Sequence, residues 1–403
     1  MATPSWVSFE LFQKTLKNCL PDQDVQLLTF TSTCAVPEGE NYTSDLYRTT
    51  LIYLDTQKNA KRTMSVIVKC GNEDGGVKTD LAKKLHLFDK EIEMFTKTFP
   101  AIYEILGEHY TLSSKCFFAC NEPHAVMVLE DLTTLGFEML PRHVGFDLEH
   151  CFKVVEKMAQ MHAASVIMYE KDPSLVKQYG EGLYADNEMI REWVGAGYTA
   201  LSDACSRWPG FEKYGYKLAA LGDEALERGF QATRRRLGGF NVLNHGDLWV
   251  NNMMFSYRES GKIKDMRFVD FQMNIFTSPA IDLHYFIATS TKMEVKIENI
   301  DIILDHYYAQ LIANLARLQY SLERVPTREQ LKKDYNSRAF YGLMGAATVL
   351  AFVKASSRKD ASFESVMKDA SVEGFRHHAY NNDRYRKHME HLLPYYDSFG
   401  ILD

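Results

Sequence analysis

Residues 244–252 read NHGDLWVNN, a polar stretch between the apolar residues VL on one side and MMF on the other. His245, Asp247, Asn251 and Asn252 lie close together within it. Burying such a cluster without hydrogen-bond partners is costly. These side chains therefore either form a turn between two strands or belong to a functional site. Patterns elsewhere in the chain are needed to choose between these two alternatives.

The bulk properties indicate a globular protein that does not bind nucleic acid. A length of 403 residues predicts two packed regions, and the formal net charge of −7 gives no basic surface for a nucleic acid. Seven scattered cysteines without a CxxC pair favour neither a zinc ribbon nor a disulfide framework. The N-terminus has no secretory pattern, and the longest apolar run, 343–353, is too short for a membrane span. We therefore expect a cytoplasmic protein.

The first third of the chain is rich in predicted strands. Runs of β-branched and aromatic residues between turn-forming residues predict strands at 25–36, 46–55, 63–70, 116–120 and 125–132. One helix is predicted at 81–98, where apolar residues recur at helical spacing. We expect this part, residues 1–131, to form an N-terminal lobe.

The remaining part, residues 132–403, is mostly helical in pattern. Helices are predicted at 147–167, 188–206, 211–236, 297–321 and 327–356. A strand-like island at 240–272 interrupts them and contains the opening motif. The predicted fold class is α+β, with a small β-rich N-terminal lobe and a larger, mostly helical C-terminal lobe.

The island predicts a β-hairpin that gives the polar cluster a partner. If the turn centres on Gly261, Asn252 and Asp270 are each nine residues from the centre and lie roughly opposite one another in an antiparallel pair. An amide oxygen beside a carboxylate suits magnesium. Asp247 lies on the loop entering the hairpin, where it can face the same point as a base.

Two residues of the N-terminal part complete the pattern. Lys69 ends a predicted strand, and Glu91 lies on the apolar stripe of the predicted helix, where a carboxylate needs a partner such as Lys69. Taken singly, Lys69 and Glu91 could be solvent-exposed charges and Asp270 the end of a strand. Their joint order, with HxDxxxxN followed by a strand ending in DF, resembles the catalytic loop and metal-binding segment of the protein-kinase-like fold.

The chain as a whole resembles the ecdysteroid kinase-like (EcKinase or CHK kinase-like) family of insects and other arthropods. That family is a branch of the fold that also holds choline kinases and aminoglycoside phosphotransferases. The motifs that carry the resemblance are GENYTSDLYR (39–48), VIVK (66–69), FDKEIEMF (88–95), VLEDL (128–132), MAQMHAAS (158–165), HGDLWVNNMMF (245–255) and VDFQMNIFTSPAIDLHYF (269–286). The resemblance implies ATP- and Mg²⁺-dependent phosphorylation of a small-molecule hydroxyl, on an ecdysteroid or, in detoxification, a xenobiotic. Only nine residues separate DFQ from Asp282, too few for the peptide-docking platform of a protein kinase.

The resemblance also implies roles for individual residues. Asp247 would be the catalytic base, Asn252 and Asp270 would bind magnesium, and Lys69 would contact the ATP phosphates while paired with Glu91. The residues expected to cover the phosphates are Asn41, Tyr42, Thr43 and Ser44, although this loop lacks a GxGxxG pattern. Backbone groups near Glu130 and Leu132 would meet the adenine.

Two residues are expected to support the catalytic loop. His245 is predicted to brace it by hydrogen bonds more than to transfer protons. Asp282 would be a structural brace and no metal ligand. Asn251 has no assigned role.

The acceptor pocket is expected in the helical lobe, with Trp193, Tyr198 and Trp249 as candidate walls. Aromatic walls suit a steroid, and they suit a quaternary ammonium equally well through cation–π contact. Ordinary core packing is an alternative for Trp193 and Tyr198. Two other functions stay open at this point: a choline- or ethanolamine-type kinase, and a catalytically silent ligand-binding protein.

Overall fold

The computed structural model describes residues 4, 6–20, 24–35, 44–71, 77–107, 109–222 and 224–403, without the side chains of residues 77, 78, 81, 297 and 363. Of the loop expected to cover the phosphates, Ser44 is described and is buried. Asn41, Tyr42 and Thr43 lie outside the described residues.

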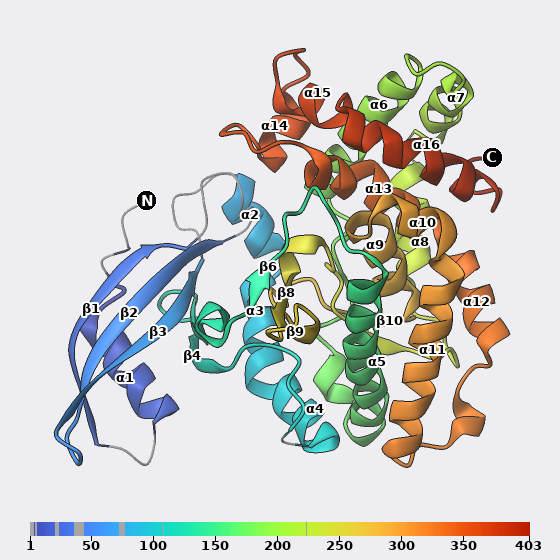
Figure 1. Ribbon diagram of the computed structural model, residues 1–403. Coiled ribbons are helices and arrows are strands. Elements are labelled where there is room, and N and C mark those ends of the chain that lie inside the picture. The colour runs from blue at the N-terminus through green and yellow to red at the C-terminus, as the bar shows by residue number, and fades with distance from the viewer. Residues whose placement is uncertain are drawn as a thin grey trace.

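The N-terminal part is built on one antiparallel sheet. Its strands lie in the order β1-β2-β3-β5-β4, with bounds β1 (Val25–Cys34), β2 (Asp45–Asp55), β3 (Ala60–Cys70), β5 (Val126–Glu130) and β4 (Cys116–Cys120). All five were predicted. Along β2 buried residues alternate with more exposed ones, as expected of a strand with one covered face. Helix α1 (Phe9–Cys19) lies against the sheet (Figure 1). Its Phe12 and Leu16 are buried in the same apolar cluster as residues of the sheet.

The prediction of a single helix at 81–98 is wrong, because the helix is interrupted there. Helix α2 (Val77–Lys84) ends before His86, which has a φ of 52° in the left-handed region. Helix α3 (Leu87–Glu93) then begins and continues through a π-helical turn, Met94–Thr98, into α4 (Phe99–Leu106). A single left-handed residue breaks the helix without interrupting the apolar spacing, so periodicity could not reveal it.

The C-terminal part is mainly helical. Helix α5 (Leu148–Lys171) packs along α11 (Ile300–Arg317), and α9 (Ala280–Ser290) packs on α13 (Ala339–Lys354), as Figure 1 shows. The other α-helices described here are α6 (Glu188–Cys205), α7 (Glu212–Leu221), α8 (Glu224–Thr233), α10 (Met293–Glu298), α12 (Arg328–Ser337), α14 (Phe363–Lys368), α15 (Phe375–Tyr380) and α16 (Asp383–Asp397).

The predicted extent of two long helices in this part is wrong, because each is divided into two shorter helices. The segment 211–236 forms α7 and α8, and between them Gly222 adopts a positive φ of 45°. The segment 327–356 forms α12 and α13, which meet at Arg338 with φ −112° and ψ 14°. Both breaks are local turns inside continuous helical patterns.

Five short strands lie among these helices. Strands β6 (Glu138–Met139), β8 (Met253–Tyr257) and β9 (Ile263–Phe268) form one sheet, and β7 (Val242–Asn244) pairs with β10 (Ile275–Thr277). The predicted hairpin is β8 and β9, but its register differs from the prediction by one residue. Met253 pairs with Phe268, so Asn252 lies opposite Val269 and not Asp270. An irregularity between Ser256 and Tyr257 takes up one residue, so the turn is not symmetric about Gly261.

The described residues pack into three apolar clusters. One lies under the N-terminal sheet, and a large one joins α3 and α4 to the C-terminal helices. A small third cluster at the junction contains Leu132, Phe137 and Met254, with Val269 against it. The α+β, two-lobed, kinase-like fold is therefore confirmed, while the division at residue 131 stays a prediction. Among the described helices, none is long and apolar enough to cross a membrane.

Candidate active site

Lys69 stands at the junction of the two parts of the chain. It is 3% exposed, and its Nζ donates to Glu91 Oε2 at 2.6 Å and to Asp270 Oδ1 at 2.5 Å. Burial alone would lower the pKa of Lys69, but the carboxylates of Asp270 and Glu91 outweigh it and raise that pKa. The ammonium therefore stays charged and ties strand β3 to helix α3 and to the segment after β9.

Glu91 links the same lysine to the backbone of the DF segment. Its Oε1 accepts a 3.1 Å hydrogen bond from the backbone N–H of Phe271, while Oε2 accepts from Lys69. Burial raises the pKa of Glu91 to about 7, against the opposing attraction of Lys69. The Phe271 ring packs edge-on against Phe95 in the π-helical turn after α3 and against Phe99 at the start of α4. The sequence pattern placed Glu91 on the inner face of its helix, and the structure gives it two partners there.

Asp270 is turned toward the lysine by an unusual backbone conformation. Its φ is 68°, in the left-handed region that non-glycine residues seldom adopt. The turn comes directly after β9 and aims Oδ1 at Lys69, and Oδ2 accepts a 3.2 Å hydrogen bond from Gln272 Nε2. Backbone strain of this kind is concentrated at functional sites. It also explains why simple strand alternation could not place this side chain.

Asp247 and Asn252 face one another across the loop 245–252. Asn252 Nδ2 donates to Asp247 Oδ2 at 3.0 Å and to the Asp247 carbonyl at 2.8 Å. The other carboxylate oxygen, Oδ1, accepts a 2.6 Å hydrogen bond from the hydroxyl of Tyr285. Burial raises the pKa of Asp247 to about 7, and the bond from Tyr285 opposes that rise. A carboxylate with such a pKa is suited to accept a proton near neutral pH.

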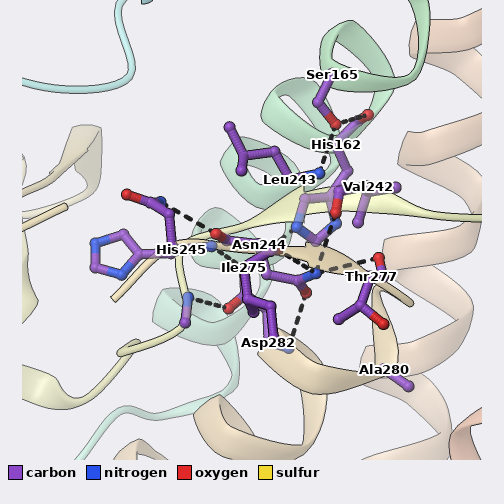
Figure 2. A network of polar contacts seen from close by, with 12 residues as sticks. His162, Ser165, Val242, Leu243, Asn244, His245, Ile275, Thr277, Ala280 and Asp282 are labelled. Atoms are coloured by element: carbon purple, nitrogen blue, oxygen red, sulfur yellow. Dashed lines mark hydrogen bonds and ion pairs between the residues drawn. The ribbon is translucent and has the colours of Figure 1, made fainter. Parts of the chain in front are cut away.

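The carboxylate of Asp282 binds the backbone of the loop 245–252, as Figure 2 shows. Its two carboxylate oxygens accept from the N–H of His245 at 2.7 Å and of Gly246 at 2.8 Å. His162 Nε2 lies 3.2 Å from Asp282 Oδ2, and the backbone N–H of Asp282 donates to Asn244 Oδ1. The carboxylate is fully buried and faces these donors, which accords with a brace.

His245 is held in one tautomer by its neighbours. Its Nε2 lies 3.0 Å from the carbonyl of Val269, which can only accept, so this nitrogen carries the proton. Its Nδ1 then accepts from the backbone N–H of Asp247 at 3.3 Å. Burial lowers the pKa of His245, although the charge of Asp282 opposes this. The neutral ring joins the loop to the end of β9.

Sequence reasoning missed Asn244, Gly246, Asp131 and Tyr285. Asn244 Nδ2 lies 3.2 Å from the carbonyls of Val242, Ile275 and Thr277, and so joins β7 to β10 (Figure 2). Its position at the head of the opening motif was the only signal for it.

Gly246 has a positive φ of 82°, and a Cβ there would overlap the Met273 carbonyl. The glycine between His245 and Asp247 could have indicated a close backbone approach.

Asp131 connects the N-terminal sheet to the segment that leads into the second lobe. It accepts from Arg48 Nε at 2.9 Å, from Ser65 Oγ at 2.7 Å and from the Thr133 backbone at 3.2 Å. Burial would raise its pKa, but the hydrogen bonds from Arg48 and Ser65 lower it. An acid directly after the apolar strand VMVLE was the available signal.

The residues expected near adenine lie at the same junction. Glu130 ends β5, and its backbone N–H donates to the Lys115 carbonyl at 2.9 Å. Leu132 begins a 3₁₀ turn and is 3% exposed, in contact with the small apolar cluster that includes Met254. A buried apolar cluster thus includes the first residue of this turn.

The candidate acceptor residues differ in their surroundings. Trp193 and Tyr198 are both buried in the helical core, where Trp193 stacks on Tyr184 and Tyr198 stacks on Phe340. Trp249 is half-buried and precedes the short turn that carries Asn252. Core packing therefore accounts for much of the environment of the first two.

The protein side chains at the site could hold a metal ion only together with the phosphates of a bound nucleotide. In the described part of the chain, no group of three or more His, Cys, Asp and Glu could hold a metal ion. Mg²⁺ is commonly held by one or two protein oxygens together with substrate phosphates and water. Asn252 uses its Nδ2 for Asp247, which leaves Oδ1 as the amide end suited to a cation. Asp270 and Asn252 therefore fit a nucleotide-dependent magnesium site.

Comparison with known proteins gives the chain its family. No curated protein matches it. Residues 38–320 match the ecdysteroid kinase-like family, a range that runs from before β2 to the end of α11 and includes the whole of the site described above. Membership implies a small-molecule kinase-like protein with phosphotransferase activity, and in general the use of ATP and Mg²⁺. The chain belongs to the ecdysteroid kinase-like family.

Proposed function

We propose that the protein transfers the γ-phosphoryl group of ATP to a hydroxyl of a small molecule. The observation that carries this proposal is the buried ammonium of Lys69, which bridges Glu91 and Asp270 at 2.6 and 2.5 Å. A stably charged lysine beside a carboxylate that can face a metal is what phosphoryl transfer requires on the nucleotide side. A ligand-binding protein without catalysis would have no need of this arrangement.

The nucleotide is proposed to lie between the sheet and the apolar cluster. Lys69 would contact its phosphates, and Leu132 and Met254 would face the adenine ring. Backbone groups near Glu130 and Leu132 would supply its polar contacts. Ser44, which is buried directly before β2, is proposed to lie beside the phosphates.

Asp270 and Asn252 are proposed to hold the metal. Bound Mg²⁺ would neutralise the phosphate charge. Asp270 Oδ2, which also accepts from Gln272 Nε2, and Asn252 Oδ1 are the side-chain oxygens of these two residues that do not bond to Lys69 or Asp247.

Asp247 is proposed to orient and deprotonate the acceptor hydroxyl. As the acceptor oxygen bonds to the transferred phosphorus, its proton passes to Asp247, and the bond to the leaving ADP oxygen breaks. The pKa of about 7 leaves a substantial ionised fraction at neutral pH. Because Asp247 must be ionised to act, activity should rise with pH through that value.

A small acceptor is favoured over a protein. Gln272 is followed by β10 (Ile275–Thr277), and α9 begins at Ala280, so no long segment is present to dock a peptide. We propose an ecdysteroid or a xenobiotic alcohol as the substrate class. A choline- or ethanolamine-type acceptor is the second candidate, because the aromatic residues of the helical lobe would also bind a quaternary ammonium.

A substrate screen by mass spectrometry tests the proposal. The protein is incubated with ATP, Mg²⁺ and a panel of hydroxylated steroids, plant phenolics, choline and ethanolamine, and each compound is examined for the gain of one phosphate. We expect a product in the wild type, its loss in Asp247→Asn, and its retention in Asp203→Asn, an exposed acid on α6. Equal product from the Asp247→Asn variant and the wild type would refute the proposed mechanism.

A further inference from the structure

The hydrogen bond from Tyr285 to Asp247 is the shortest contact that Asp247 makes among the described residues. The phenol oxygen lies 2.6 Å from Oδ1, whereas Asn252 Nδ2 lies 3.0 Å from Oδ2. Each carboxylate oxygen therefore carries one fixed donor. Because a carboxylate oxygen has two lone pairs, each keeps one for an incoming hydroxyl.

Tyr285 and Asp282 act from the same face of one helix. They are three residues apart on α9, a spacing that puts side chains next to each other on a helix surface. Asp282 holds the backbone N–H groups of His245 and Gly246, and Tyr285 holds the side chain of Asp247. Helix α9 thus contacts three consecutive residues of the loop, and the last of these contacts reaches the reacting group itself.

The surroundings of Tyr285 keep it a donor. The side chain is 1% exposed and packs near Tyr341, whose ring contacts Tyr184. Burial raises the pKa of Tyr285 well above its ordinary value, and the charge of Asp247 adds to this. The phenol therefore keeps its proton over the whole working pH range and cannot accept one from the substrate.

We propose that Tyr285 is a positioning residue for phosphoryl transfer, whose hydroxyl fixes Asp247 Oδ1 so that the acceptor hydroxyl meets the carboxylate in one orientation. This inference rests on the proposed function and deepens it. With both oxygens tied, the carboxylate cannot rotate about its Cβ–Cγ bond.

Replacement of Tyr285 by phenylalanine tests this inference, because it removes only the hydroxyl. In Tyr285→Phe the acid limb of the pH profile of kcat/KM should move upward by about one unit, since a hydrogen bond to a charged group is lost. We expect kcat at pH 7 to fall by about 10-fold with little change in KM for ATP. The matched control is Tyr380→Phe, another fully buried tyrosine, whose hydroxyl donates to the Ala347 carbonyl at 2.8 Å. It should leave the acid limb in place.

A second readout separates this inference from the proposed function. Carboxyl NMR of aspartate-labelled protein, with Asp247→Asn to assign the signal, reports the titration of Asp247 without turnover. An upward shift in Tyr285→Phe supports the contact even if no acceptor is phosphorylated, in which case it is the proposed function that fails. An unchanged Asp247 titration and an unchanged acid limb in Tyr285→Phe would overturn the inference. A fall in activity that only follows a loss of folded protein would overturn it too.

Discussion

The bridge made by Lys69 gives a quantitative test of the site, because its removal leaves two carboxylates facing each other without a cation. In Lys69→Met the charges of Glu91 and Asp270 lose the ammonium that lies 2.6 and 2.5 Å away. Glu91 is 1% exposed, so water cannot replace the lost partner. The substitution should therefore lower both stability and nucleotide binding.

The magnitude follows from burial. Breaking a buried ion pair by removing one partner typically destabilises by about 3–5 kcal/mol. At about 2.1 cal/mol/K per residue, the unfolding entropy of a chain of 403 residues converts this to a decrease of about 4–6 °C in Tm. The exposed pair of Lys97 and Glu93 is the control, because its members are 59% and 34% exposed. Lys97→Met should change the free energy of unfolding by less than about 1 kcal/mol.

The pH dependence of Lys69→Met distinguishes lost electrostatics from lost packing. Burial already raises the pKa of Glu91 to about 7, and without Lys69 that pKa should rise further. A carboxyl whose pKa is raised in the folded state binds protons more tightly there than in the unfolded chain. Stability is then gained as the pH falls through the raised pKa. Thermal unfolding from pH 8 to 5 should show the gap to the wild type closing, whereas a constant gap would refute the electrostatic reasoning.

Two further substitutions test the loop and a buried cation. Gly246→Ala should lower Tm by more than Gly261→Ala. Both glycines have a positive φ (82° and 79°), but only at Gly246 would the added methyl group overlap the Met273 carbonyl. Equal decreases in Tm would contradict this reasoning. Lys354→Met should stabilise the protein below about pH 8, since burial and then Arg384 lower the pKa of Lys354 to about 8. The unfolded lysine binds protons more tightly, so wild-type stability should rise by up to about 3 kcal/mol between pH 8 and 10.5. Chemical unfolding of the variant should show no such rise.

The sequence was informative where a local pattern carries the information. Helical spacing placed Glu91 on the inner face of its helix, and strand propensity placed Lys69 at the end of a strand. The hairpin around Gly261 was visible because turn residues separate two apolar runs. The two-lobed α+β architecture followed from the change of these patterns along the chain.

The rest depends on single backbone angles and on distant contacts. The left-handed φ of His86 and the positive φ of Gly222 divide predicted helices without changing their apolar spacing. One irregularity in the hairpin shifts the strand register by a residue. Asp270, which follows the hairpin, has a left-handed φ, and its carboxylate contacts Lys69. Tyr285 contacts Asp247, which lies 38 residues earlier in the chain, and no local sequence pattern reveals such a contact.

The site is proposed to transfer phosphate, with Asp247 receiving the proton of the acceptor. The most direct measurement compares the wild type with Asp247→Asn, each incubated with ATP, Mg²⁺ and the acceptor panel, by the rate at which any compound gains one phosphate. We expect transfer by the wild type that requires Mg²⁺, and a rate at least about 100-fold lower in Asp247→Asn while ATP binding is retained. An equal rate in the two proteins, or ATP binding without transfer to any acceptor by the wild type, would contradict it.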